Sequence, residues 1–129
     1  MFRCRFGSGR DAQVKKRLLL VDDEPALLEL LTKYLERLGY QVEACSSGEE
    51  AIACFDEDPQ RYDLVLTDLT LGGMSGEEML AQMQSRHPGL RAIISSGYPH
   101  VPKSKKVVFL QKPFVPRMLA DAIEKLTGA

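Results

Sequence analysis

Four short apolar segments of this 129-residue chain are followed by residues that could do chemistry. Residues 18–21 are followed by Asp22, Asp23 and Glu24, and residues 62–67 are followed by Asp68. Ser96 follows residues 92–95, and Lys112 stands two positions after residues 107–110. Crowded carboxylates repel one another in a cleft, and a lysine ammonium or a bound divalent cation relieves that repulsion. Oxygen ligands with positions open to water and phosphate suit Mg²⁺ better than Ca²⁺. Together such residues could transfer a phosphoryl group: a carboxylate attacks in line while metal and ammonium stabilise the equatorial oxygens.

From Arg17 onward the chain alternates between strand and helix patterns. Leu18 to Val21 is a continuous apolar run, which is typical of a strand buried on both faces. Pro25 fits the first turn of the helical pattern that follows, and Gly39 ends it. The same reasoning predicts five strands, at residues 18–21, 40–45, 62–67, 92–95 and 107–110. It predicts helices that begin near residues 25, 47 and 75, and a last helix over residues 119–126.

Serines mark the start of the second and third helical patterns. Ser47 and Glu50 have the spacing of a capping box, and Ser75 stands where a third helix would be capped. Between Asp68 and that helix the chain is rich in glycine. Because glycine loses more backbone entropy on ordering than other residues do, Gly72 and Gly73 are expected to loosen this loop.

Strands that alternate with helices predict a parallel sheet covered by helices on both faces. Five short strands in about 110 residues favour an α/β fold, the flavodoxin-like doubly wound sheet with strand order 2-1-3-4-5. In such a sheet, ligands bind outside the carboxyl ends of the strands, beside the switch in strand order. We therefore expect Asp22, Asp23, Asp68, Ser96 and Lys112 to converge on one edge of the sheet.

The segment between the fourth and fifth strands lacks a helical pattern. It contains Pro99 and Pro102 and little apolar periodicity, and proline inside a helix removes a hydrogen bond. We predict that the fourth helix is shortened to at most one turn or replaced by a loop. The chain must still return across the sheet, so an extended connection is expected.

Composition argues against several classes of function. Seventeen basic and eighteen acidic residues give a formal charge of −1, so no global field attracts nucleic acid or an anionic membrane. No apolar run approaches the roughly 18 residues of a membrane span, and none forms the core of a secretory signal. Three cysteines without CxxC spacing indicate neither a disulfide framework nor a zinc site. We expect reduced thiols in a cytosolic core.

Residues 1–16 have a different composition from the rest. Basic residues predominate there around Gly7-Ser8-Gly9, and no periodicity suggests packing. We expect a basic leader or linker, disordered or artificially added, followed by a single domain over residues 17–129.

Four separated motifs resemble those of bacterial response-regulator receiver domains. They are Val21-Asp22-Asp23-Glu24, Leu66-Thr67-Asp68, Ser95-Ser96-Gly97 and Gln111-Lys112-Pro113-Phe114. The similarity runs from Arg17 to Leu126, in the order of the family and near its spacing. Because every motif stands at a predicted strand end, the combination is far more specific than any one of them.

The resemblance implies a role for each residue. Asp68 would accept a phosphoryl group from a histidine kinase or a histidine phosphotransfer protein, and Asp23 would bind Mg²⁺ directly. Asp22 would bind the metal through water, and Asp68 and the Thr70 backbone carbonyl would be further ligands. Ser96 and Lys112 would contact phosphoryl oxygens. Phe109 would be the switch aromatic, and Pro113 would follow a cis peptide bond. Simpler roles stay open: Asp22 and Asp23 as helix N-terminal charges, Phe109 as core.

Two features depart from the family pattern. Family members usually carry an apolar residue and then proline shortly after the phosphorylated aspartate, whereas here Leu71 is followed by Gly72. The connection from Ser96 to Lys112 is shorter than usual by roughly one and a half to two helical turns. Because the family often uses this region as its output surface, we expect that surface to be altered.

The function implied by the resemblance is a phosphoacceptor switch of a two-component phosphorelay, acting on an unknown downstream protein. It would be cytoplasmic, would catalyse only its own phosphorylation and dephosphorylation, and would neither bind nucleic acid nor insert into a membrane. The sequences Ser-Gly-Tyr-Pro and Gln-Lys-Pro-Phe slightly favour the receiver of a hybrid histidine kinase over a stand-alone protein.

Other functions fit the residues less well. A docking module that never becomes phosphorylated stays open as an alternative, although it would need none of the acids, the hydroxyl or the lysine of the four motifs. A phosphatase with an aspartyl intermediate needs a second acid two positions after the nucleophile, where Thr70 stands. A flavin carrier needs a phosphate-binding loop after the first strand, where Asp22-Asp23-Glu24 would repel phosphate.

Overall fold

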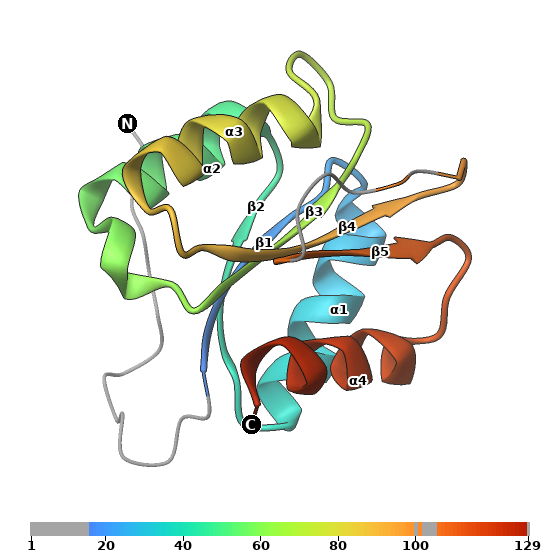
Figure 1. The fold of residues 1–129 in the computed structure, drawn as a ribbon. Helices are drawn as coiled ribbons and strands as arrows, with labels where there is room; N and C mark the ends of the chain where they lie inside the picture. The colour runs from blue at the N-terminus through green and yellow to red at the C-terminus, as the bar shows by residue number, and fades with distance from the viewer. Residues whose placement is uncertain (1–15, 100, 102–105, 129) are drawn as a thin grey trace.

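The computed structural model describes residues 16–99, 101 and 106–128. Their five strands form one parallel sheet with the order β2-β1-β3-β4-β5 (Figure 1). The strands are β1 (Arg17–Val21), β2 (Gln41–Cys45), β3 (Leu64–Asp68), β4 (Arg91–Ser96) and β5 (Val107–Gln111). The helices are α1 (Pro25–Arg37), α2 (Gly48–Glu57), α3 (Gly76–Arg86) and α4 (Pro116–Thr127), with a 3₁₀ turn η2 (Pro59–Arg61). The predicted fold class and strand order are confirmed.

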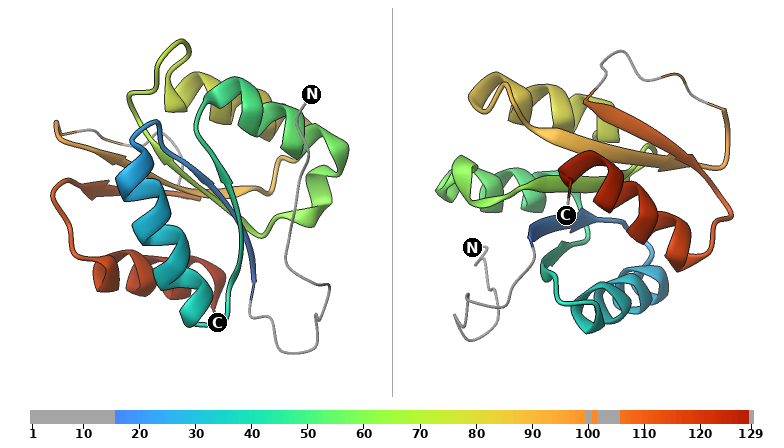
Figure 2. Two further views of the ribbon diagram at one scale, coloured as in Figure 1. Left: turned by 180° about the vertical axis from the view of Figure 1, so that it is seen from behind. Right: turned by 60° about the horizontal axis from the view of Figure 1, so that its bottom comes forward.

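Helices cover both faces of the sheet, with α2 and α3 on one side and α1 and α4 on the other (Figures 1 and 2). The central strand β1 contributes to two separate hydrophobic clusters. Leu19 and Val21 pack on the side of α2 and α3, whereas Leu18 and Leu20 pack on the opposite side. Both faces of β1 are therefore buried, which explains why its sequence is continuously apolar rather than alternating.

The register of the strands brings their carboxyl ends together. Val21 in β1 pairs with Thr67 in β3, and Asp68 pairs with Ser95 in β4. The backbone N–H of Asp22 extends the ladder by donating to the Cys45 carbonyl at 3.1 Å. The residues that follow β1, β3 and β4 therefore share one edge of the sheet, beside the switch in strand order between β1 and β3.

Serine caps begin α2 and α3, but only one capping box is complete. Ser75 accepts a hydrogen bond from the Glu78 N–H, and the Glu78 carboxylate accepts one from the Ser75 N–H. Ser47 accepts from the Glu50 N–H, but the Glu50 carboxylate accepts from Ser46 instead of Ser47. The capping box expected at Ser47 is thus half formed, since the carboxylate reaches one residue further back.

The third strand starts later than its apolar sequence predicts, at Leu64 rather than Tyr62. Residue 63 is held at the start of the sheet by Arg17, which exchanges hydrogen bonds of 2.8 Å with its backbone N–H and its carboxylate. Tyr62 stacks on Phe55 of α2, with ring centroids 6.0 Å apart. The 3₁₀ turn before it directs this aromatic residue into the core instead of the sheet.

Between β4 and β5, none of the described residues is helical. Tyr98 and Val101 are 78% and 84% exposed there. This agrees with the predicted loss of the fourth helix, while His100 and residues 102–105 lie outside the described part, as does nearly all of the predicted leader at 1–16. Within the described ranges, no helix is long and apolar enough to cross a membrane.

Candidate functional site

A single ammonium group lies between two carboxylates at the carboxyl edge of the sheet. The Nζ atom of Lys112 is 3.4 Å from Asp22 Oδ2 and 3.5 Å from Asp68 Oδ1. The side chains of Asp22 and Asp68 are only 5% and 14% exposed, and that of Lys112 is 24% exposed. Because two largely buried carboxylates share one cation, a net negative charge remains at the site.

The backbone around Lys112 fixes the origin of its side chain. Its N–H donates to the Ser96 carbonyl at 2.8 Å, which continues the pairing of β5 with β4 beyond the strand end. The peptide bond between Lys112 and Pro113 is cis, as the resemblance implied. From this origin at the end of β5, the lysine side chain reaches the carboxylates at the ends of β1 and β3.

Asp22 and Asp23 are adjacent in sequence but differ in environment. Asp22 is buried, and its Oδ1 accepts the Glu24 N–H at 2.9 Å. Asp23 is exposed, and its Oδ2 accepts the Gly72 N–H from the β3–α3 loop at 3.2 Å. Carboxylate oxygens of these two residues and of Asp68 lie within 4.8 Å of one another. An all-oxygen group of this kind fits a hard divalent cation.

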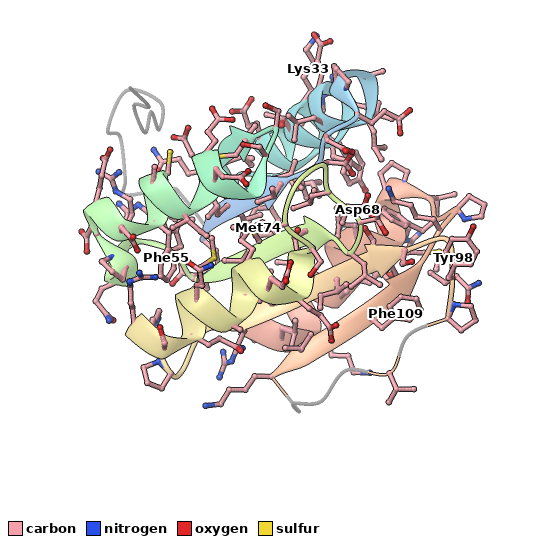
Figure 3. The ribbon with its side chains drawn as sticks, turned by 90° about the horizontal axis from the view of Figure 1, so that it is seen from above. Lys33, Phe55, Asp68, Met74, Tyr98 and Phe109 are labelled. Atoms are coloured by element: carbon pink, nitrogen blue, oxygen red, sulfur yellow. The ribbon has the colours of Figure 1, made fainter. Side chains whose placement is uncertain are left out.

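The loop between β3 and α3 is anchored at both ends. The Leu69 N–H donates to the Ser95 carbonyl at 2.7 Å, and the Gly76 N–H donates to the Leu69 carbonyl at 2.8 Å. Figure 3 shows Asp68 where its strand ends, beside the loop that carries Met74. Met74 lies against Gly48 at the start of α2, where a Cβ would overlap its side chain. The loop is therefore packed on a neighbouring helix as well as tied to the sheet.

The carboxyl group of Asp68 is harder to ionise than that of an ordinary aspartate. Burial raises the pKa of its carboxyl above the ordinary value, Lys112 opposes that shift, and Asp22 and Asp23 add to it. Asp68 and Asp22 also line a small pocket together with apolar side chains such as Ile93, Phe114 and Leu119. Ionised Asp68 is thus held in surroundings that favour any added positive charge.

The other predicted site residues differ in where they lie: Ser96 ends β4, Thr70 follows β3, and Phe109 lies in the middle of β5. Ser96 is buried at the end of β4, and its hydroxyl accepts the Tyr98 N–H at 3.0 Å. Thr70 is exposed in the β3–α3 loop. Phe109, labelled in Figure 3, is half-buried and pairs with Ile94 of β4. The roles of Ser96, the Thr70 carbonyl and Phe109 in phosphorylation remain predictions.

Two glycines contribute to the site in ways that sequence reasoning missed. The Gly72 N–H holds Asp23, and Gly76 allows the start of α3 to pass directly beside the Asp68 backbone. Glycine in a loop next to a charged cluster is compatible with close backbone approach. That signal was present in the sequence, but it does not say which atoms come together.

A second group of possible metal donors lies in the core, away from this edge. Atoms of Glu43, Cys45 and Cys54 lie within 4.8 Å of one another, and all three residues are buried. Cys45 and Cys54 form no disulfide bond, and burial raises the pKa of the Cys45 thiol far above its usual range. The two described cysteines are thus free thiols in the core, as the sequence predicted.

Comparison with known proteins places these features in a family. The model of the response regulator receiver domain family matches residues 18–124. The response regulator receiver protein CpdR of Brucella abortus is 33% identical over 119 residues, which cover 86% of this chain and 96% of that protein. The sensor kinase CckA of the same organism is 31% identical over 115 residues, which cover 84% of this chain.

Structural similarity agrees with the sequence matches. The crystal structure of the receiver domain of the hybrid histidine kinase CckA has a TM-score of 0.79 and 28% identity, and the match covers 86% of this chain and 98% of that one. Several curated relatives are much longer: the chain spans 12% of CckA and 25% of the Escherichia coli transcriptional regulatory protein GlrR. With its fold, its acidic edge and these matches taken together, the chain belongs to the response regulator receiver domain family of two-component signalling.

Proposed function

We propose that this receiver domain, over residues 17–129, accepts a phosphoryl group on Asp68 from a phosphohistidine of a histidine kinase or phosphotransfer protein. The observation that carries this proposal is the position of Lys112 Nζ, 3.4–3.5 Å from both Asp22 and Asp68. An ammonium beside a nucleophilic carboxylate is placed to stabilise negative charge on phosphoryl oxygens. Residues 1–16 act as a leader or linker in this proposal.

In the transfer, an Oδ atom of Asp68 bonds to phosphorus while the P–N bond of the donor breaks. The imidazole leaves with the bonding pair and takes up a proton. Lys112 moves its interaction from Asp68 toward a phosphoryl oxygen, and the Ser96 hydroxyl donates to another. Asp22, Asp23, Asp68 and the Thr70 carbonyl would hold Mg²⁺, which neutralises charge on the carboxylates and the phosphoryl group when bound.

The same residues support a change in a partner-binding surface. Because the Ser96 hydroxyl already accepts the Tyr98 N–H, any movement of Ser96 toward a phosphoryl group acts on the exposed connection after β4. We propose that an unidentified downstream protein recognises this region. A cytoplasmic domain, either alone or within a hybrid histidine kinase, is consistent with relatives as different in length as CpdR and CckA.

The test is incubation with acetyl phosphate and MgCl₂ followed by intact-mass measurement. We expect the mass of one added phosphoryl group, absent in Asp68→Asn and retained in Asp121→Asn, which changes an exposed carboxylate on α4. A histidine kinase or phosphotransfer protein should replace acetyl phosphate as donor. If neither small-molecule nor protein donors add mass, the domain is a docking module that works without phosphorylation, and the proposal is wrong.

A further inference from the structure

We propose that the backbone N–H of Gly72 positions Asp23 for the metal ion, a role that the proline usual at this place in the family cannot perform. The inference rests on the proposed function only in assuming that the acidic group binds Mg²⁺. It concerns one atom of this chain, and it predicts that Gly72→Pro weakens metal binding.

The position of the Asp23 carboxylate depends on the β3–α3 loop more than the positions of the Asp22 and Asp68 carboxylates do. The Asp22 carboxylate is held by the Glu24 N–H and by Lys112, and the Asp68 carboxylate also faces Lys112. Asp23 is exposed, and within the described residues the hydrogen bond at its carboxylate comes from Gly72, 49 positions away in sequence. A freely rotating exposed carboxylate would have to be ordered when a cation binds.

The anchors of the β3–α3 loop determine where the Gly72 N–H points. Leu71, directly before it, is 6% exposed and packs in the cluster beneath α2 and α3. Gly73, directly after it, has a φ of 91°, a conformation that favours glycine. The complete capping box at Ser75 then fixes the start of α3. The donor is therefore held by its flanking residues and does not have to be ordered by the metal.

The contact is compatible with a metal bound at the same carboxylate. An ionised carboxylate has about four lone-pair positions, so Oδ2 can accept the N–H while the group still offers oxygen lone pairs to a cation. A hydrogen bond to a charged acceptor is stronger than one between neutral groups. Before a cation arrives, the N–H also adds partial positive charge among three acids that repel one another. Proline has no N–H, so this contact cannot form with proline at residue 72.

A different effect of Gly72 predicts the opposite order of affinities. If glycine acted only by loosening the loop, both alanine and proline would order it and strengthen metal binding, with proline the stronger of the two. If the N–H matters, alanine keeps it and proline removes it. A Cβ at residue 72 would lie 3.9 Å from Asp23 Oδ2, an ordinary contact, so Gly72→Ala is a matched control.

The first experiment measures Mg²⁺ binding to the unphosphorylated protein by titration calorimetry. We expect wild type and Gly72→Ala to bind with similar affinity, or Gly72→Ala more tightly, and Gly72→Pro about three- to tenfold more weakly. Thermal unfolding of each metal-free variant checks that it is folded. If Gly72→Pro binds Mg²⁺ as tightly as Gly72→Ala, the positioning role is refuted.

A second measurement does not depend on the proline variant. In metal-free protein, the Gly72 amide proton should resonate downfield because of its charged acceptor, and Asp23→Ala should shift it upfield more than the amide of Gly89, which lies away from the site. An unmoved Gly72 amide overturns the inference. The outcomes distinguish the two proposals. If the protein gains no phosphoryl group but Gly72→Pro binds Mg²⁺ more weakly than Gly72→Ala, only the proposed function is refuted. If the protein is phosphorylated but the two variants bind Mg²⁺ equally tightly, only the role of Gly72 is refuted.

Discussion

Gly76 at the start of α3 lies directly beside the backbone of Asp68, so that a Cβ at residue 76 would overlap the Asp68 carbonyl oxygen. The same oxygen accepts the Thr67 hydroxyl at 2.9 Å, and a Cβ would also lie 3.1 Å from that hydroxyl. Any side chain at residue 76 must therefore push α3 away from the end of β3. The relationship joins the position of a helix to the position of the proposed phosphoacceptor.

Gly76→Ala should lower the free energy of unfolding by about 1–3 kcal/mol, since the added methyl group meets rigid backbone rather than a movable side chain. Urea denaturation measures this change. Gly89→Ala is the control, because its Cβ would meet only the His87 ring at 3.8 Å. If the two alanine variants lose equal stability, the contact between residue 76 and the Asp68 backbone does not restrict the side chain at residue 76.

Asp68→Asn should stabilise the metal-free protein at neutral pH. The folded-state pKa of Asp68 is raised, so the folded protein binds this proton more tightly than the unfolded chain does. Wild-type stability therefore falls as pH rises from the unfolded pKa of about 3.9 through the folded pKa, and an uncharged amide avoids that loss. We expect the Tm of Asp68→Asn at pH 7 to be higher by about 2–6 °C.

The pH dependence provides the check on this interpretation. Near pH 3, where the carboxyl is protonated in both folded and unfolded states, the difference in Tm between wild type and Asp68→Asn should disappear. Asp121→Asn on the exposed surface of α4 should change Tm little at either pH. A Tm difference that is independent of pH would show that charge is not its cause.

Lys112→Met should have opposite effects on stability and on metal affinity. Methionine retains much of the aliphatic stem but removes the cation that lies between Asp22 and Asp68. The metal-free protein should lose about 1–2 kcal/mol of stability, because the carboxylates then repel one another without compensation. Mg²⁺ should bind several-fold more tightly, since no fixed cation repels it. Calorimetry measures this, with Lys125→Met as control; weaker Mg²⁺ binding would contradict the prediction.

Cys45 and Cys54 should be slow to react with thiol reagents in the folded protein. Both are 1% exposed, and burial keeps the Cys45 thiol protonated at neutral pH. In a Cys4→Ser background we expect no rapid reaction with a disulfide reagent, and two thiols to react after unfolding. Rapid modification of the folded variant would show that α2 opens from the sheet.

The fold could be predicted from sequence because its signals are local and repeated. Continuous apolar runs such as Leu18 to Val21 predict strands buried on both faces, and Pro25 and Ser75 mark where helices begin. Strand order then follows from the rules for parallel sheets, and the acids of β1 and β3 must meet. The early start assigned to β3 was wrong because the turn at Pro59–Arg61, which turns Tyr62 into the core, has no distinct apolar pattern.

Sequence alone thus determined which residue types gather at the sheet edge: acids at the ends of two of the strands, a hydroxyl at the end of a third and a lysine just after a fourth. Only the tertiary structure decided how they divide their contacts. Lys112 faces Asp22 and Asp68, whereas Asp23 is held by the Gly72 N–H. The reason is that backbone donors and close approaches depend on how a loop packs against distant elements, and amino-acid types do not encode which N–H will face which carboxylate.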